Sequence, residues 1–126
     1  MLAIASIVIY ALIELVYGFY NNATWDDDCP TRYYNTLHAF QEPANFVSLW
    51  NRPLFVLLFC FPVHISKHSI LIMMVALSCI ATWYLYLGLK KSGVTNAWLA
   101  IPLFLFQAFY LGVSRNAEVE PIAAAF

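Results

Sequence analysis

The side chains that could do chemistry are concentrated in one stretch of the chain, 25–53. It holds four of the seven carboxylates, two of the six cationic side chains, one of the three histidines and one of the three cysteines. These residues are Asp26, Asp27, Asp28, Glu42, Arg32, Arg52, His38 and Cys29. Almost everything outside the stretch is apolar, so we expect any reactive site or partner-specific surface to lie here.

Two patterns in the chain could bind a metal ion. The adjacent carboxylates 26–28 could attract a divalent cation, but calcium loops use alternating ligands and a glycine turn, and this segment has neither. A solvated helix cap or a charge patch is the preferred interpretation, and Pro30 suits the first turn of a following helix. His64 and His68 are four residues apart and have no third ligand nearby, which favours a solvated turn. We therefore expect no metal and no cofactor.

The composition indicates which solvent surrounds these residues. The chain has 126 residues, of which 63% are hydrophobic, 17% are aromatic and only 10% are charged, against about 25% charged in an average soluble domain. Such a charge deficit is typical of an integral membrane protein. Proteins that bind nucleic acids usually carry a positive charge, and this chain has a net charge of −1, so no nucleic-acid partner is expected.

The apolar runs predict an all-α integral membrane protein with about four transmembrane helices in a single membrane domain. We expect the helices at about 1–20, 44–65, 69–89 and 96–113. A polar, partly helical loop at about 21–43 joins the first two, and a tail covers about 114–126. Within that loop, 31–40 is expected to form a short helix along the membrane surface. Its apolar side would carry Tyr33, Tyr34, Leu37 and Phe40.

Polar residues at the depth of these helices should face protein rather than lipid. Glu14 is the single charge of the first helix, and a carboxylate near the interface that reaches water or an arginine is favoured over a buried proton or ion site. Gln107 is expected to bond to a neighbouring helix. Asn51 and Arg52 lie at the edge of the second helix, which Pro53 should make irregular.

Arg52 is expected to be held by a carboxylate, and Glu42 is the first candidate. The two residues are ten apart, which is too far for neighbours on one continuous helix. Pro43 supplies the bend that the pair needs, because a residue before proline avoids the helical region. The carboxylates 26–28, or one from a partner subunit, are the alternatives.

The segment Glu42-Pro43-Ala44-Asn45-Phe46-Val47-Ser48 resembles the start of the first helix in the alkaline ceramidase-like membrane hydrolases. In that family a cysteine-containing lead-in precedes this motif and an apolar helix with a phenylalanine follows it, as Cys29 and Phe55 do here. The resemblance covers about a quarter of the chain and implies a zinc-dependent hydrolase of seven helices that acts on a lipid.

The chain departs from the family pattern at several positions. Leu49 stands where the family has an asparagine, and Ser78 is followed four residues later by Thr82 rather than by a zinc-binding histidine. The paired histidines of a late helix have no counterpart. A catalytic zinc site needs three protein ligands and an open position, so the sequence does not predict enzymatic activity.

The preferred hypothesis is a non-catalytic accessory subunit of a larger membrane-embedded complex, such as an energy-transducing complex. Its partners would be other membrane subunits and lipids, in a multi-pass arrangement for which an organellar inner membrane is slightly favoured. The contacts would use Glu42, Arg52, Asn51, Glu14 and Gln107. One alternative is a partial or degenerate ceramidase-like hydrolase that acts on a lipid. The other is a small channel-forming oligomer that uses Glu14.

Overall fold

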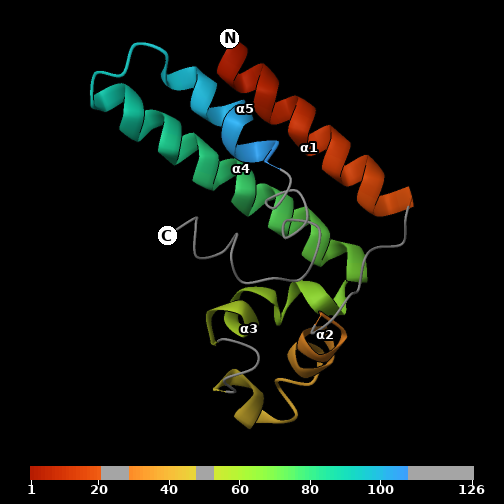
Figure 1. Ribbon diagram of the computed structural model, residues 1–126. Coiled ribbons are helices and arrows are strands. Elements are labelled where there is room, and N and C mark those ends of the chain that lie inside the picture. The colour runs from red at the N-terminus through yellow and green to blue at the C-terminus, as the bar shows by residue number, and fades with distance from the viewer. Residues whose placement is uncertain (21–28, 48–52, 108–126) are drawn as a thin grey trace.

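The computed structural model describes residues 1–20, 29–47 and 53–107 of the chain (Figure 1). Every element in these ranges is helical, and no strand occurs among them. The predicted all-α class is confirmed for this part of the chain.

Three helices lie side by side and form the main layer (Figure 1). They are α1 (Leu2–Tyr20), α4 (Lys67–Lys91) and α5 (Ala100–Leu105), and the short 3₁₀ helix η3 (Ala97–Leu99) leads directly into α5. α1 and α4 run antiparallel, so the end of α1 meets the start of α4. The buried side chains between the three helices are Ala3, Tyr10, Val75, Ile101 and Leu105.

A second, smaller layer lies at the end of the α1–α4 pair where α1 ends and α4 begins (Figure 1). It consists of α2 (Cys29–Leu37), η1 (Pro43–Phe46), α3 (Pro53–Phe59) and η2 (Pro62–His64). Its core joins it to the first turns of α4 through Phe55, Phe59, Val63, Ile70 and Met74. The polar stretch of the sequence is thus placed at one end of the long helices.

α4 has clear start and stop signals. The side chain of Ser66 accepts a hydrogen bond from the backbone N–H of His68 at 3.2 Å, which satisfies one of the free donors at the start of the helix. The helix ends at Lys91 with Ser92 as its C-cap, and Gly93 follows with a φ of 81°, a conformation that favours glycine. Its 25 residues span about 37 Å at 1.5 Å per residue.

The helix expected at 44–65 is not continuous in the structure. Its described parts are η1, a seven-residue α3 and η2. η1 begins at Pro43 and η2 at Pro62, and the described part of α3 runs from Pro53 to Phe59. Proline suits the first helical position but disfavours helix in the residue before it, so Pro43 and Pro62 each start a separate piece. Residues 48–52 lie outside the described ranges.

The helix expected at 96–113 is also shorter where the structure describes it. α5 ends at Leu105, and the backbone N–H of Phe106 bonds to the carbonyl of Pro102; residues 108–113 lie outside the described ranges. The short helix expected at 31–40 ends at Leu37 as α2. Tyr33 and Leu37, expected on a side facing the membrane surface, pack on the core of the smaller layer. Tyr34 and Phe40 instead expose about half of their surface.

Two helices in the described ranges are long and apolar enough to cross a membrane, judged by length and composition. They are Leu2–Tyr20 and His68–Lys91. These correspond to the helices expected at 1–20 and 69–89, so the two longest apolar runs of the sequence do form the two longest helices.

Candidate functional site

The interface between α1 and α4 contains a fully buried carboxylate. The buried face of α1 carries Ala3, Tyr10, Glu14 and Gly18, and Glu14 has 0% exposure. Glu14 therefore does not reach water, which was one part of the expectation for it. The other part, that it reaches an arginine, stays a prediction. A charged or polar group in such a place needs a polar environment to offset its lost hydration.

The neighbours of Glu14 along α1 define its position between the helices. Four residues before it, Tyr10 belongs to the core that includes Val75 of α4. Four residues after it, Gly18 lies directly against the side chain of Leu71 of α4. Because residues four apart share a helix face, Glu14 lies between these two contacts, inside the α1–α4 interface.

Two buried hydroxyls on α4 add to the polar content of the layer. The hydroxyl of Ser78 donates to the carbonyl of Met74 at 2.9 Å, and that of Thr82 donates to the carbonyl of Ser78 at 2.7 Å. Both residues have 0% exposure. Each hydroxyl is thus satisfied within its own helix, as is common for Ser and Thr in apolar surroundings. Their four-residue spacing in an apolar run was the sequence signal for this buried pair.

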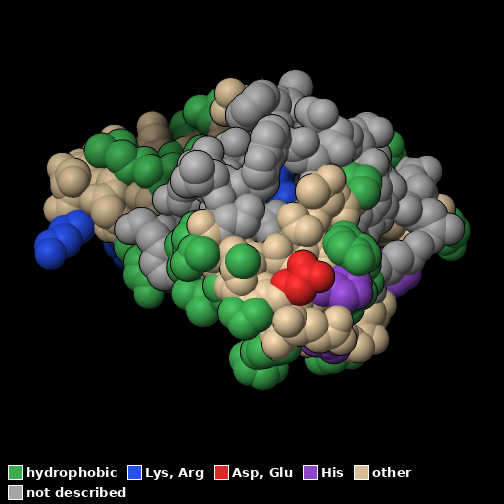
Figure 2. Space-filling view, turned by 90° about the horizontal axis from the view of Figure 1, so that it is seen from below, with side chains coloured by type: hydrophobic (Ala, Val, Ile, Leu, Met, Phe, Trp, Pro, Cys, Tyr) green, Lys and Arg blue, Asp and Glu red, His purple; other side chains and the backbone are tan. Residues whose placement is uncertain are grey.

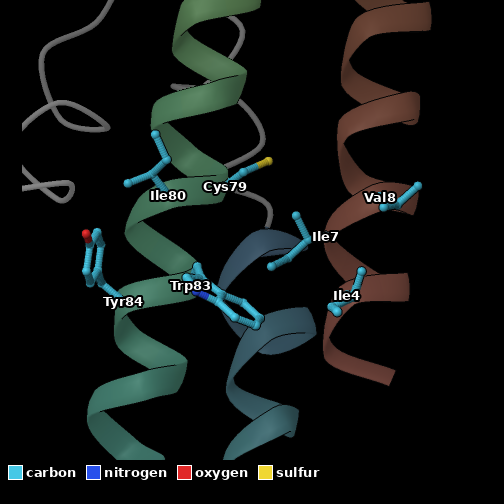
Figure 3. Close-up of a pocket in the computed structure, with 7 residues that line it drawn as sticks. All are labelled: Ile4, Ile7, Val8, Cys79, Ile80, Trp83 and Tyr84. Atoms are coloured by element: carbon cyan, nitrogen blue, oxygen red, sulfur yellow. The ribbon is translucent and has the colours of Figure 1, made fainter. Parts of the chain in front are cut away.

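An open apolar groove of about 540 Å³ lies between the N-terminal half of α1 and the C-terminal half of α4 (Figure 3). Its lining residues are Ile4, Ile7, Val8, Cys79, Ile80, Trp83 and Tyr84. In Figure 3 the indole of Trp83 reaches from α4 towards α1, and Ile7 and Cys79 point into the gap between the two helices. Trp83 also packs on Tyr86 with a ring distance of 5.3 Å. No pattern in the sequence indicated this groove.

Glu42 lies on the surface of the smaller layer. Figure 2 shows this face, where an acidic side chain lies beside a histidine among hydrophobic side chains. The carboxylate of Glu42 accepts a hydrogen bond from the side-chain amide of Asn45 at 3.4 Å. The backbone N–H of Glu42 bonds to the carbonyl of His38 at 2.8 Å, and the ring of His38 packs on Tyr34 at 4.2 Å. Tyr34, His38, Glu42 and Asn45 therefore follow one another in a series of contacts on this surface.

The other predicted contact residues have different outcomes. Asn51 and Arg52 lie outside the described residues, so the Glu42–Arg52 pair stays a prediction. Gln107 follows the end of α5 and is exposed. It is therefore not inside a helix, where it was expected to bond to a neighbour, because the helix has already ended at Leu105.

The two histidines of the η2–α4 turn have separate aromatic partners. His64 stacks on Phe40 of the smaller layer with ring centroids 6.2 Å apart, whereas His68 stacks on Phe19 of α1 at 4.7 Å. Among the described residues, no group of three His, Cys, Asp or Glu side chains is placed to hold a metal ion. His64 thus connects η2 to the segment between α2 and η1, and His68 connects α4 to α1.

The residues of the ceramidase-like motif are partly described. Glu42 and Asn45 are hydrogen-bonded to each other, and Phe55 is fully buried in the core of the smaller layer. Ser48 lies outside the described residues, as does the side chain of Cys29. Comparison of the chain with known protein families, curated proteins and solved structures finds no match.

Proposed function

We propose that the chain is a multi-pass integral membrane protein that acts as a non-catalytic accessory subunit of a larger membrane-embedded complex. In this proposal α1 and α4 cross the bilayer as an antiparallel pair, and the α2–α3 layer lies at one membrane interface. The described parts of the other two expected spans, α3 and α5, pack against this pair rather than crossing on their own.

The observation that carries the membrane placement is the outer surface of α1 and α4. Only 22% of the apolar window of α1 and 39% of that of α4 is buried inside the chain. The core helix of a soluble protein would be mostly buried, and soluble monomers rarely expose apolar patches beyond a few hundred Å². The large exposed side chains of α1 are Leu2, Ile4, Val8, Ile9, Leu12, Ile13, Val16, Tyr17, Phe19 and Tyr20.

The subunit role is supported by the distribution of polar groups in the described part of the chain. Outside the long helices, the structure describes mainly the smaller layer of α2, η1, α3 and η2. The buried side chains of this layer pack on one another and on the start of α4. Glu14 is a fully buried carboxylate in the otherwise apolar layer of the long helices. Polar groups of this kind hold membrane helices in register, which is a structural rather than a catalytic use.

The first test asks whether the chain is in the membrane. The full chain is expressed with a C-terminal tag. Membranes from the expressing cells are then washed with alkaline carbonate, which removes peripheral proteins. We expect the chain to stay in the pellet at full length, together with a known multi-pass control. Release into the supernatant would contradict the membrane placement, and loss of α1 from the pelleted chain would identify it as a cleaved signal sequence.

The second test asks what the chain assembles with. Native mass after gentle detergent extraction from the native source should show the chain together with other, different membrane subunits. A pure self-oligomer would favour the channel alternative, and a monomer would contradict the accessory role. Metal analysis of the same sample separates the hydrolase alternative, because about one zinc per chain is expected only for that reading.

A further inference from the structure

We propose that the groove between α1 and α4 is a binding site for one anionic phospholipid, with an acyl chain in the groove and the phosphate on Lys90 and Lys91. The inference rests on the membrane placement proposed above and adds a defined ligand to it. It is carried by the groove, by the position of the lysines on the same helix face, and by the aromatic residues between them.

The groove has the chemistry of an acyl-chain site. Its volume of about 540 Å³ lies within the range of small-molecule sites in proteins, about 300–1,000 Å³. Apart from the rims provided by Trp83 and Tyr84, its lining is aliphatic or a thiol. Ile4 and Val8 expose about half of their surface on the α1 side. The groove is therefore open along the helices, as an elongated apolar chain requires.

The groove leads to two cations. Lys90 follows Trp83 by seven residues and Lys91 follows Tyr84 by seven residues, and both lysines are exposed in the last turn of α4. Seven residues are close to two helical turns, so each lysine lies on the same face as its aromatic partner, about 10 Å further along the axis. Leu87, also exposed, lies between them.

This order of side chains matches the layers of a phospholipid. Aliphatic residues lie at acyl depth, Trp and Tyr side chains prefer the headgroup boundary, and lysines beyond them meet the phosphates. The two positive charges are complementary to a lipid with a net negative charge, whereas a zwitterionic lipid gains much less from them. The chemistry therefore selects an anionic phospholipid over a neutral one.

The test uses the full chain in detergent and native mass spectrometry, with titration of phosphatidylglycerol or of phosphatidylcholine carrying the same acyl chains. We expect one phosphatidylglycerol per chain, bound about 25-fold more tightly than phosphatidylcholine. The factor follows from about 1 kcal/mol for each lysine near an anionic lipid and 1.4 kcal/mol for each factor of ten. Equal binding of the two lipids would overturn the proposal.

Two pairs of variants locate the site. Lys90→Gln with Lys91→Gln should remove the preference for phosphatidylglycerol, while Lys67→Gln at the opposite end of α4 should leave it unchanged. Val8→Trp should fill the groove and weaken the binding of both lipids at least tenfold. Ile13 is exposed elsewhere on α1, so Ile13→Trp should leave the binding of both lipids unchanged. Ile4→Trp fills the same groove from one turn away and serves if Val8→Trp fails to fold.

The outcomes separate this proposal from the one on which it rests. A chain released by alkaline carbonate would contradict both. A chain that stays in the membrane but shows no effect of the lysine or groove variants would contradict the lipid site alone. If Val8→Trp instead converted a dimer to a monomer with lipid binding unchanged, the groove would belong to a contact between two copies, and the lipid site would be overturned.

Discussion

At the scale of single residues, Glu14 is the side chain whose environment differs most from that of its type. A glutamate with 0% exposure in the middle of an apolar interface has lost its hydration and depends on neighbouring groups. Tyr10 and Gly18, one helical turn before and after it, both contact the core between the helices. We therefore assign Glu14 a structural role in the α1–α4 interface.

We expect Glu14→Ala to lower the free energy of unfolding by about 2–4 kcal/mol, because it removes most of a fully buried side chain and leaves a cavity. Glu14→Gln keeps the size and one carbonyl oxygen, so its loss should be smaller. Thermal and denaturant unfolding in mild detergent measure both changes. Ile13→Ala is the matched control, since Ile13 is exposed on the same helix. A Glu14→Ala protein as stable as this control would contradict the structural role.

The sequence predicted part of this residue-scale picture. Glu14 stood out in the sequence because it is the only charge in a long apolar run. Glu42 and Asn45 stood out as members of one motif, and the structure adds the hydrogen bond between them. The burial of Glu14 could not be predicted, because it depends on α4, which lies more than fifty residues further along the chain. The direction in which a side chain faces is set by the helix packed against it.

At the scale of elements, α1 and α4 are in close contact at Gly18. A Cβ atom added there would collide with the side chain of Leu71, whereas one added at Gly88 of α4 would meet nothing within 4 Å. Small residues at such crossings let two membrane helices come close together and gain dispersion energy. The missing side chain of Gly18 therefore makes room for Leu71 in the contact between the two long helices.

Gly18→Ala should destabilise the helix pair by about 1–3 kcal/mol, the usual range for overpacking a close contact. Gly88→Ala makes the same chemical change in open space, and should be neutral or stabilise by up to about 1 kcal/mol through helix propensity. Adding Leu71→Ala to Gly18→Ala should recover part of the loss. Unfolding curves of the four proteins test this. Equal effects of the two glycine substitutions would show that α1 and α4 are not in close contact at Gly18.

The elements show where sequence reasoning succeeds. α1 and α4 were predicted within two residues at each end, because each is an apolar run with no internal proline. The run at 44–65 was predicted as one irregular helix, but among its described residues Pro43 and Pro62 each start a separate 3₁₀ piece. The length of the apolar run outweighed these signals in the prediction, although each proline disfavours helix in the residue before it.

At the scale of the whole molecule, the α2–α3 layer and the α4–η3 turn lie at opposite ends of the α1–α4 pair (Figure 1). α4 alone is about 37 Å long, which exceeds the roughly 30 Å hydrocarbon core. If the pair crosses the bilayer, these two regions must lie on opposite sides of the membrane. Their separation follows from pairing between distant segments, and the sequence could not assign it.

Gln41 and Val94 report on the two ends, because both are exposed and each lies in a short connection. In a background of Cys29→Ser, Cys60→Ala and Cys79→Ala, single cysteines are introduced as Gln41→Cys or Val94→Cys. In sealed vesicles, a membrane-impermeant maleimide should label one of them at least tenfold faster than the other. After permeabilisation both should be labelled alike, which controls for intrinsic reactivity. A pair of helices that crosses a bilayer cannot place both cysteines on one side. Equal labelling in sealed vesicles of uniform orientation would therefore mean that α1 and α4 lie along the surface, and that their exposed apolar side chains are covered in some other way.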